Sequence, residues 1–74
     1  MRKMTYEEFE THINDQITRI TLERGTGRLT EKQFARECMD LAKWAAERIK
    51  YLSMADQIKF TKSQAMEALR RGAD

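Results

Sequence analysis

The chain has 74 residues, of which 35% are charged, and a formal net charge of +2 at pH 7. This length allows one domain with a small core, which rarely supplies more than ~3–5 kcal/mol of stability without a disulfide, a metal or association. One cysteine and one histidine exclude an intrachain disulfide and a structural zinc site. We therefore expect the domain to associate with a protein partner or with a second copy of itself.

The net charge is too small to indicate nucleic-acid binding by itself, although the basic excess lies in the C-terminal part of the chain. Residues 1–47 carry 8 basic and 9 acidic side chains, whereas residues 48–74 carry 6 basic and 3 acidic side chains. No apolar run approaches the ~18 residues of a membrane span, and no apolar signal region follows Met1-Arg2-Lys3. We expect a cytoplasmic protein with no membrane contact and a reduced Cys38.

Three short motifs predict three helix starts. Each has an apolar residue, then Thr, then Glu or Gln three positions after the Thr: Met4-Thr5-x-x-Glu8, Leu29-Thr30-x-x-Gln33 and Phe60-Thr61-x-x-Gln64. In such a capping box the Thr side chain accepts a hydrogen bond from an amide of the first turn, and the Glu or Gln accepts one from the Thr amide. Nothing predicts a strand. The expected fold class is all-α, a small helical bundle that forms a single domain over residues 1–74.

The first helix is expected over residues 5–24, approximately. Apolar residues spaced three and four apart form one stripe on it: Tyr6, Phe9, Ile13, Ile17 and Ile20. Gly25 and Gly27 then supply the stop, because glycine adopts the left-handed conformation at a helix end without steric cost. The short connection makes this helix and the next an antiparallel hairpin.

The second helix is expected over residues 30–52, approximately, and is unusually apolar. Its central stripe consists of Phe34, Cys38, Leu41, Ala45, Ile49 and Leu52. Three alanines and Met39 widen the stripe on one side, and Trp44 and Tyr51 widen it on the other. The resulting arc of about 240° exceeds the ~100° that a helix on a core requires. Either this is the central helix of a monomeric three-helix bundle, or part of the arc is a face for self-association or a partner.

The C-terminal part, about 54–71, forms either one helix or a pair. Ser53-x-x-Asp56 is a further possible cap, so the second helix either breaks there into a short helix over residues 54–59 or continues. The last helix is expected from Thr61 to about Arg71, and three of its residues should face inward: Ala65, Ala68 and Leu69.

The sequence contains no pattern that predicts catalysis. His12 is the only imidazole and Cys38 the only thiol, and the sequence lacks a phosphate-binding glycine loop, a nucleophile motif and metal-ligand spacing. His12 is expected at the boundary of the first helix's stripe, and Cys38 as a small buried thiol. We expect no catalytic, cofactor-binding or metal-binding residue, no cofactor and no small-molecule substrate.

One segment resembles a known motif. The sequence YLSMADQIKFTKSQAMEALRR at residues 51–71 resembles the helix-turn-helix of LacI-type repressors. Ala55 matches the small residue of its first helix, Phe60 the buried residue of its turn and Thr61 the cap of its second helix, while Ala65 and Ala68 match residues that pack inward. The segment departs from the motif at Lys59, where the turn usually has glycine. The resemblance implies DNA contacts by Lys62, Ser63, Gln64, Glu67, Arg70 and Arg71.

The favoured function is a non-enzymatic, small helical regulator that acts by protein–protein interaction or self-association, and DNA binding is the alternative. Trp44 and Tyr51 are seven positions apart, as are anchors of helices that dock in grooves, and both types are enriched at the energetic centres of interfaces. The expected interface consists of Trp44, Tyr51, Met39 and Met54. Packing against the C-terminal helix is the other interpretation of Trp44 and Tyr51. The small size suits an accessory inhibitor of a phage or other mobile element.

Overall fold

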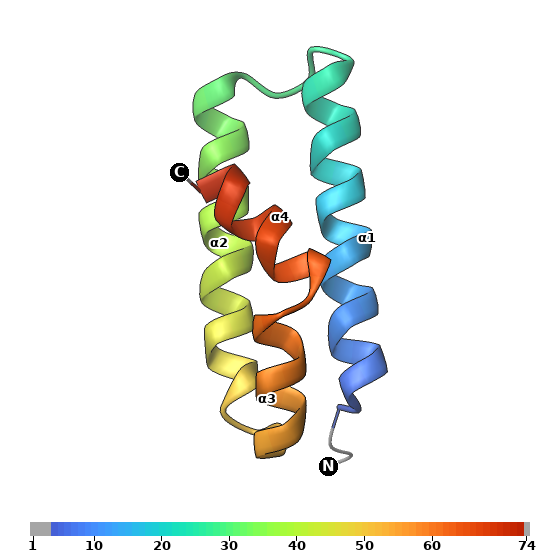
Figure 1. Ribbon diagram of the computed structural model, residues 1–74. Helices are drawn as coiled ribbons and strands as arrows, with labels where there is room; N and C mark the ends of the chain where they lie inside the picture. Colours follow the sequence, from blue (N-terminus) through green and yellow to red (C-terminus); the bar gives the residue numbers. More distant parts are fainter. Residues whose placement is uncertain (1–3, 74) are drawn as a thin grey trace.

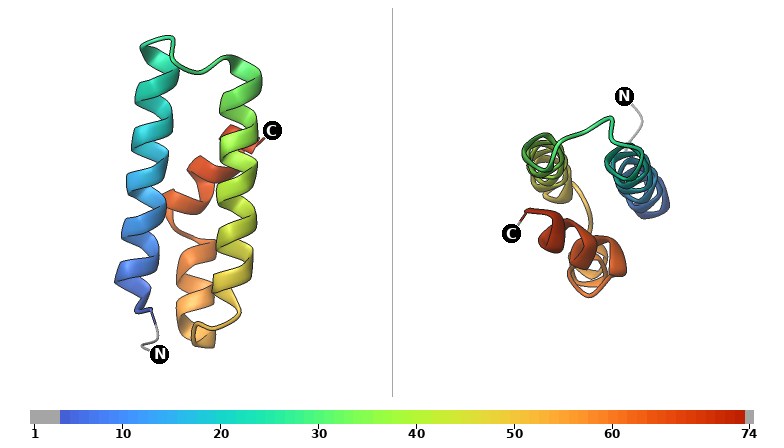
Figure 2. Two further views of the ribbon diagram at one scale, coloured as in Figure 1. Left: turned by 180° about the vertical axis from the view of Figure 1, so that it is seen from behind. Right: turned by 90° about the horizontal axis from the view of Figure 1, so that it is seen from above.

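The computed structural model describes residues 4–73, and all regular structure in this range is helical (Figure 1). The helices are α1 (Tyr6–Gly25), α2 (Glu31–Ile49), α3 (Met54–Thr61) and α4 (Gln64–Ala73). The predicted all-α fold class is therefore confirmed. α1 and α2 form the predicted antiparallel hairpin, and α3 and α4 return along one side of it (Figures 1 and 2).

The first two capping boxes form as predicted. The Thr5 hydroxyl accepts a hydrogen bond from the Glu8 amide at 3.1 Å, and the Glu8 carboxylate accepts one from the Thr5 amide at 3.1 Å. At the start of α2, Thr30 and Gln33 make the same reciprocal pair at 3.1 and 3.0 Å. Between these helices Gly27 has a φ of 81°, a conformation that glycine adopts without the steric cost other residues meet.

The chain breaks after α2, which is the first of the two alternatives for the C-terminal part. α2 ends at Ile49, three residues before the expected Leu52. Ser53 caps α3 by accepting a hydrogen bond from the Asp56 amide at 3.2 Å. The Gln57 side-chain amide donates to the Leu52 carbonyl at 3.0 Å and thereby satisfies a carbonyl that the break leaves without a helical partner.

The third capping box was predicted wrongly. Thr61 is the last residue of α3, and its hydroxyl donates to the Gln57 carbonyl at 2.9 Å. α4 begins three residues later, at Gln64, after Ser63, whose hydroxyl accepts from the Met66 amide at 3.2 Å. Thr61 and Ser63 are both competent caps, and the chain turns only after Phe60 has reached the core. α4 also continues to Ala73, beyond the expected end near Arg71.

The core lies where α1, α2 and α4 meet. Phe9 is completely buried, with its ring edge-on to Phe60 at 4.9 Å between centroids. The buried apolar residues are Tyr6, Phe9, Ile13, Ile20, Cys38, Leu41, Ala45, Phe60, Ala65 and Leu69.

Ile17, Phe34 and Ile49 belong to the predicted apolar stripes but are only half-buried, and so is Ala68, which was expected to face inward. For Ile17, Phe34 and Ile49 the reason is that α4 is short and crosses only part of the hairpin (Figures 1 and 2). At the upper end of the hairpin the Arg24 guanidinium covers the Phe34 ring instead, 4.0 Å from its centroid.

Candidate functional site

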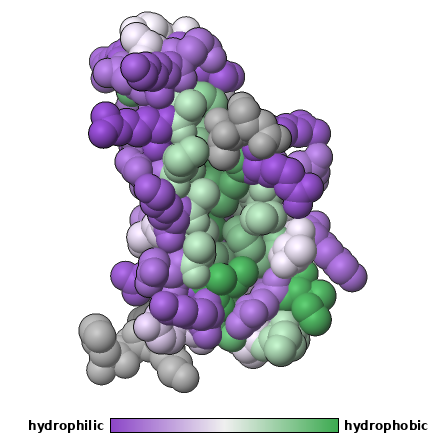
Figure 3. Space-filling model, turned by 90° about the vertical axis from the view of Figure 1, so that its left-hand side faces the viewer, coloured by the Kyte–Doolittle hydropathy of each residue, from purple (hydrophilic) through white to green (hydrophobic). Residues whose placement is uncertain are grey.

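An apolar groove runs between α2 and the α3–α4 segment. It has a volume of about 340 Å³, and Figure 3 shows apolar surface along the middle of this face with hydrophilic residues on both margins. Its lining consists of Ala42, Ala45, Ala46, Ile49, Phe60, Thr61, Met66, Leu69 and Arg70. We call this set the α2/α4 groove.

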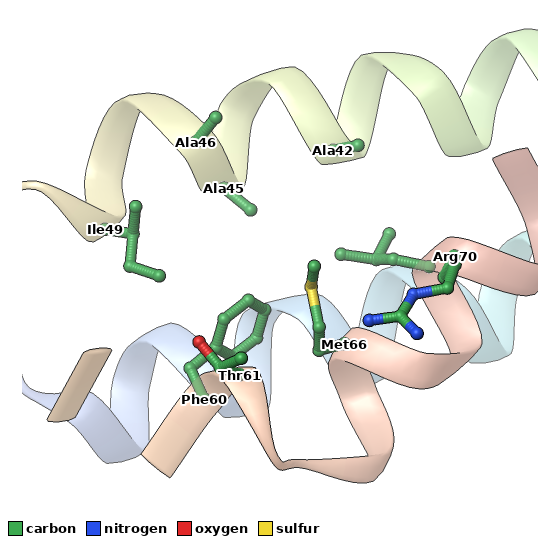
Figure 4. A pocket seen from close by; sticks show the side chains of 9 residues that line it. Ala42, Ala45, Ala46, Ile49, Phe60, Thr61, Met66 and Arg70 are labelled. Atoms are coloured by element: carbon green, nitrogen blue, oxygen red, sulfur yellow. The ribbon is translucent and has the colours of Figure 1, made fainter. Parts of the chain in front are cut away.

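The α2 wall of the groove consists of small side chains. Ala42, Ala46 and Ile49 follow one another at spacings of four and three residues, so they lie on one edge of the helix. Alanine at two of these positions leaves room that a larger residue would fill (Figure 4). Ala46 is exposed to solvent although its side chain is an apolar methyl group.

The opposite wall comes from the junction of α3 and α4. Phe60 and Leu69 line the groove and are 3% exposed. Met66 is half-buried and points from α4 toward α2 (Figure 4). Since Lys62 and Ser63 interrupt the helix at this junction, α4 turns across the hairpin. This change of direction leaves the groove open beside α2.

Arg70 is the one charged residue in the groove lining (Figure 4). It is exposed, and no ion pair joins it to any residue between 4 and 73. Its neighbour Arg71 is different, because its guanidinium donates to Glu67 at 2.8 Å. Arg70 therefore places a positive charge beside apolar surface with no carboxylate of the described chain to balance it.

The structure does not bring the predicted interface residues into one patch. Trp44 is half-buried against α1, with its ring stacked on Phe9 at 5.7 Å and on His12 at 4.2 Å. Tyr51 is 69% exposed and shares a shallow depression with Trp44 on the side of α2 away from the groove. Met39 and Met54 are exposed, and by helical register Met39 lies on the alanine edge of α2.

Sequence reasoning missed the residues that line the groove, although one signal was present. The alanine edge of α2 was visible as one side of the wide apolar arc, but Met39 was the one residue of that edge selected for the interface, beside Trp44 and Tyr51 on the aromatic side. Ala42, Ala46 and Met66 are the missed residues. The preference for aromatic anchors therefore selected the side of the arc that α1 covers.

The residues predicted to contact DNA also lie in different environments. Ser63 is engaged within the fold, since its hydroxyl donates to the Phe60 carbonyl at 2.7 Å and caps α4. Arg71 pairs with Glu67, and Arg70 lines the groove. Lys62 and Gln64 are exposed. Ala55, which matches the small residue of the motif's first helix, is exposed as well.

The described residues contain no arrangement suited to metal binding. No group of three His, Cys, Asp or Glu side chains in this part of the chain is placed to hold a metal ion. Burial raises the pKa of the Cys38 thiol, which disfavours the nucleophilic thiolate. His12 stacks on Trp44 and borders a shallow acidic surface on α1.

Comparison of the chain with known protein families, curated proteins and solved structures finds no match. Among the described residues, no helix has both the length and the apolar character that crossing a membrane requires.

Proposed function

We propose that this chain is a non-enzymatic regulator that acts by binding another protein through the α2/α4 groove. The observation that carries the proposal is the groove itself, an apolar channel of about 340 Å³ on the surface of a small domain. Ligand and peptide sites are typically concave, mostly apolar and bordered by a few polar groups. Accessory inhibitors of phages and other mobile elements are one class of small protein that would act in this way.

The groove replaces the Trp44–Tyr51 surface as the proposed interface. Trp44 already contacts Phe9 and His12, so a partner could contact only the remaining part of the indole surface. The groove offers apolar surface of Ala46, which is exposed, and of Ala42 and Met66, which are half-buried. Burying such surface contributes about 25 cal/mol per Å² to association before the costs of ordering.

DNA binding remains the second candidate function. Lys62 and Arg70 support it, because both are exposed and neither forms an ion pair with a described residue. Affinity for random duplex that falls steeply with salt and is lost in the Lys62→Glu variant would favour this function over the groove.

A titration with a model helix tests the proposed function. The probe is an amphipathic peptide of about 16 residues, long enough for appreciable helix, with leucines at i, i+4, i+7 and i+11 and only Gln and Ser between them. We expect saturable 1:1 binding by calorimetry that Ala46→Glu weakens at least about tenfold, or 1.4 kcal/mol. Thr18→Glu is the matched control, because it places the same charge at an exposed position of α1.

Two results would contradict the proposal. One is the absence of saturable binding to the folded wild-type chain. The other is binding that Ala46→Glu leaves unchanged. Circular dichroism of both variants shows whether they retain the helical content of the wild type, so that a loss of binding can be assigned to the groove.

A further inference from the structure

We infer that the occupant of the α2/α4 groove is an amphipathic helix of another protein whose apolar anchors are flanked by carboxylates. The inference rests on the proposed function and specifies the chemistry of the partner. It depends on the charges around the groove, on the shape of its α2 wall and on what a second copy of this chain could offer.

Cations without ion pairs to described residues lie at the α4 side of the groove. These are Arg70, which lines the groove, and Lys62 at the end of α3. The ion pairs within residues 4–73 involve other cations: Arg19, Lys50 and Arg71.

This distribution of charge favours an acidic partner. A helix with carboxylates beside its apolar anchors would place them near Arg70 and Lys62, and opposite potentials across an interface raise the association rate and select the partner. The lining of the groove contains no acidic residue that could balance Arg70.

The dimensions of the groove suit two turns of helix. Ala42 and Ile49 are seven residues apart on α2, which corresponds to about 10 Å along the axis. Anchors at i, i+4 and i+7 of a docked helix span the same length. The small side chains of Ala42 and Ala46 allow close approach, within the 8–10 Å interaxial distances of packed helices.

A second copy of the chain is a poorer occupant. If two copies paired groove to groove, the interface would bury Arg70 of both copies, and neither groove lining supplies a carboxylate to balance them. The exposed face of α1 is acidic and bears Glu7 and Asp15, but Leu22 is its one large exposed apolar residue. α1 of another copy therefore lacks the row of apolar anchors that the groove would accept.

The experiment compares three peptides that share one leucine stripe and differ only in their flanking residues, which are Glu, Lys or the neutral Gln and Ser. We expect the Glu-flanked peptide to bind the full chain at least about tenfold more tightly than the Lys-flanked one at low salt. The difference should shrink as NaCl increases, because salt screens exposed charges. Arg70→Glu should abolish the preference, whereas Arg28→Glu, with the same change in charge in the hairpin turn, should retain it.

The outcomes separate this inference from the proposed function. Equal or tighter binding of the Lys-flanked peptide would overturn the inference, and the function would stand if the neutral peptide still bound in the groove. Failure of all three peptides would contradict both. A dimer in sedimentation that dissociates in the Ala46→Glu variant would identify a second copy as the occupant and would also overturn the inference.

Discussion

The indole of Trp44 lies against the imidazole of His12, with 4.2 Å between the ring centroids and 30° between the planes. Because His12 is on α1 and Trp44 on α2, this contact helps to join the two helices of the hairpin. The same indole also stacks on Phe9. Such aromatic contacts stabilise the fold by more than the burial of their surface area alone. Trp44 is therefore a structural residue in this fold.

Replacement of Trp44 should consequently destabilise the domain. We expect Trp44→Ala to lower the free energy of unfolding by about 2 kcal/mol, less than the 3–5 kcal/mol of a fully buried tryptophan, because the side chain is half-buried. Tyr51→Ala is the control and should change stability by no more than about 0.5 kcal/mol, since Tyr51 is 69% exposed. Urea denaturation measures both, and equal effects would contradict the assignment.

Leu41 should be among the most sensitive positions of α2. Its side chain is 7% exposed and belongs to the core. Leu41→Ala should cost roughly 2–5 kcal/mol through lost burial and the cavity that remains, which approaches the whole stability of so small a domain. Met39→Ala, at a 48% exposed position of the same helix, should leave the melting temperature nearly unchanged. A cooperative Leu41→Ala transition at the wild-type temperature would show that the core is placed wrongly.

Two neighbouring hydroxyls test where α4 begins. Ser63→Ala removes the cap of α4 and should cost about 1 kcal/mol. Thr61→Ala should be neutral or slightly stabilising, because Thr61 lies within α3 and alanine has the higher helix propensity. The opposite order of the two effects would favour the capping box predicted at Thr61.

Thr30→Ala should again cost about 1 kcal/mol, since that cap forms as predicted.

Tyr6 should make stability depend on alkaline pH. Burial, and the hydrogen bond that its hydroxyl donates to Glu10 at 2.6 Å, raise the pKa of Tyr6 to about 12 from its ordinary value of 10.0. Below pH 10 the phenol is protonated in both the folded and the unfolded chain, so its contribution to stability does not change with pH. Between pH 10 and 12 it ionises mainly in the unfolded chain, so stability falls as pH rises.

The loss through Tyr6 should be on the order of 2 kcal/mol by pH 12. Other groups titrate in the same range, so the readout is the difference between the wild type and Tyr6→Phe. This difference should shrink above pH 10, because the variant has no phenol to ionise at that position. Parallel curves for the wild type and Tyr6→Phe would contradict the account.

Local signals in the sequence predicted the helix starts wherever one cap was available. The boxes at Thr5 and Thr30 need only residues within one turn, so they form independently of the rest of the chain. At the last helix two hydroxyl residues compete, and the burial of Phe60 against Phe9 decides where the chain turns. A contact between residues so far apart in the chain leaves no local sequence pattern from which it could be predicted.

The candidate site depended on tertiary structure in the same way. The sequence showed that α2 has more apolar surface than one neighbour can cover, and this part of the prediction led toward the groove. It could not show that α1 would cover Trp44 while α4 would leave Ala42 and Ala46 open. That difference depends on the direction of α4 after Ser63.

The central claim is that the α2/α4 groove, and not the surface around Tyr51, binds a partner. The most direct measurement is a set of amide ¹H–¹⁵N spectra of the full chain during titration with the neutral leucine-stripe peptide. The account predicts the largest shift changes at Ala42, Ala46 and Met66, with Tyr51 nearly unchanged. Changes centred on Lys43, Glu47 and Tyr51, with Ala46 and Met66 unaffected, would contradict it.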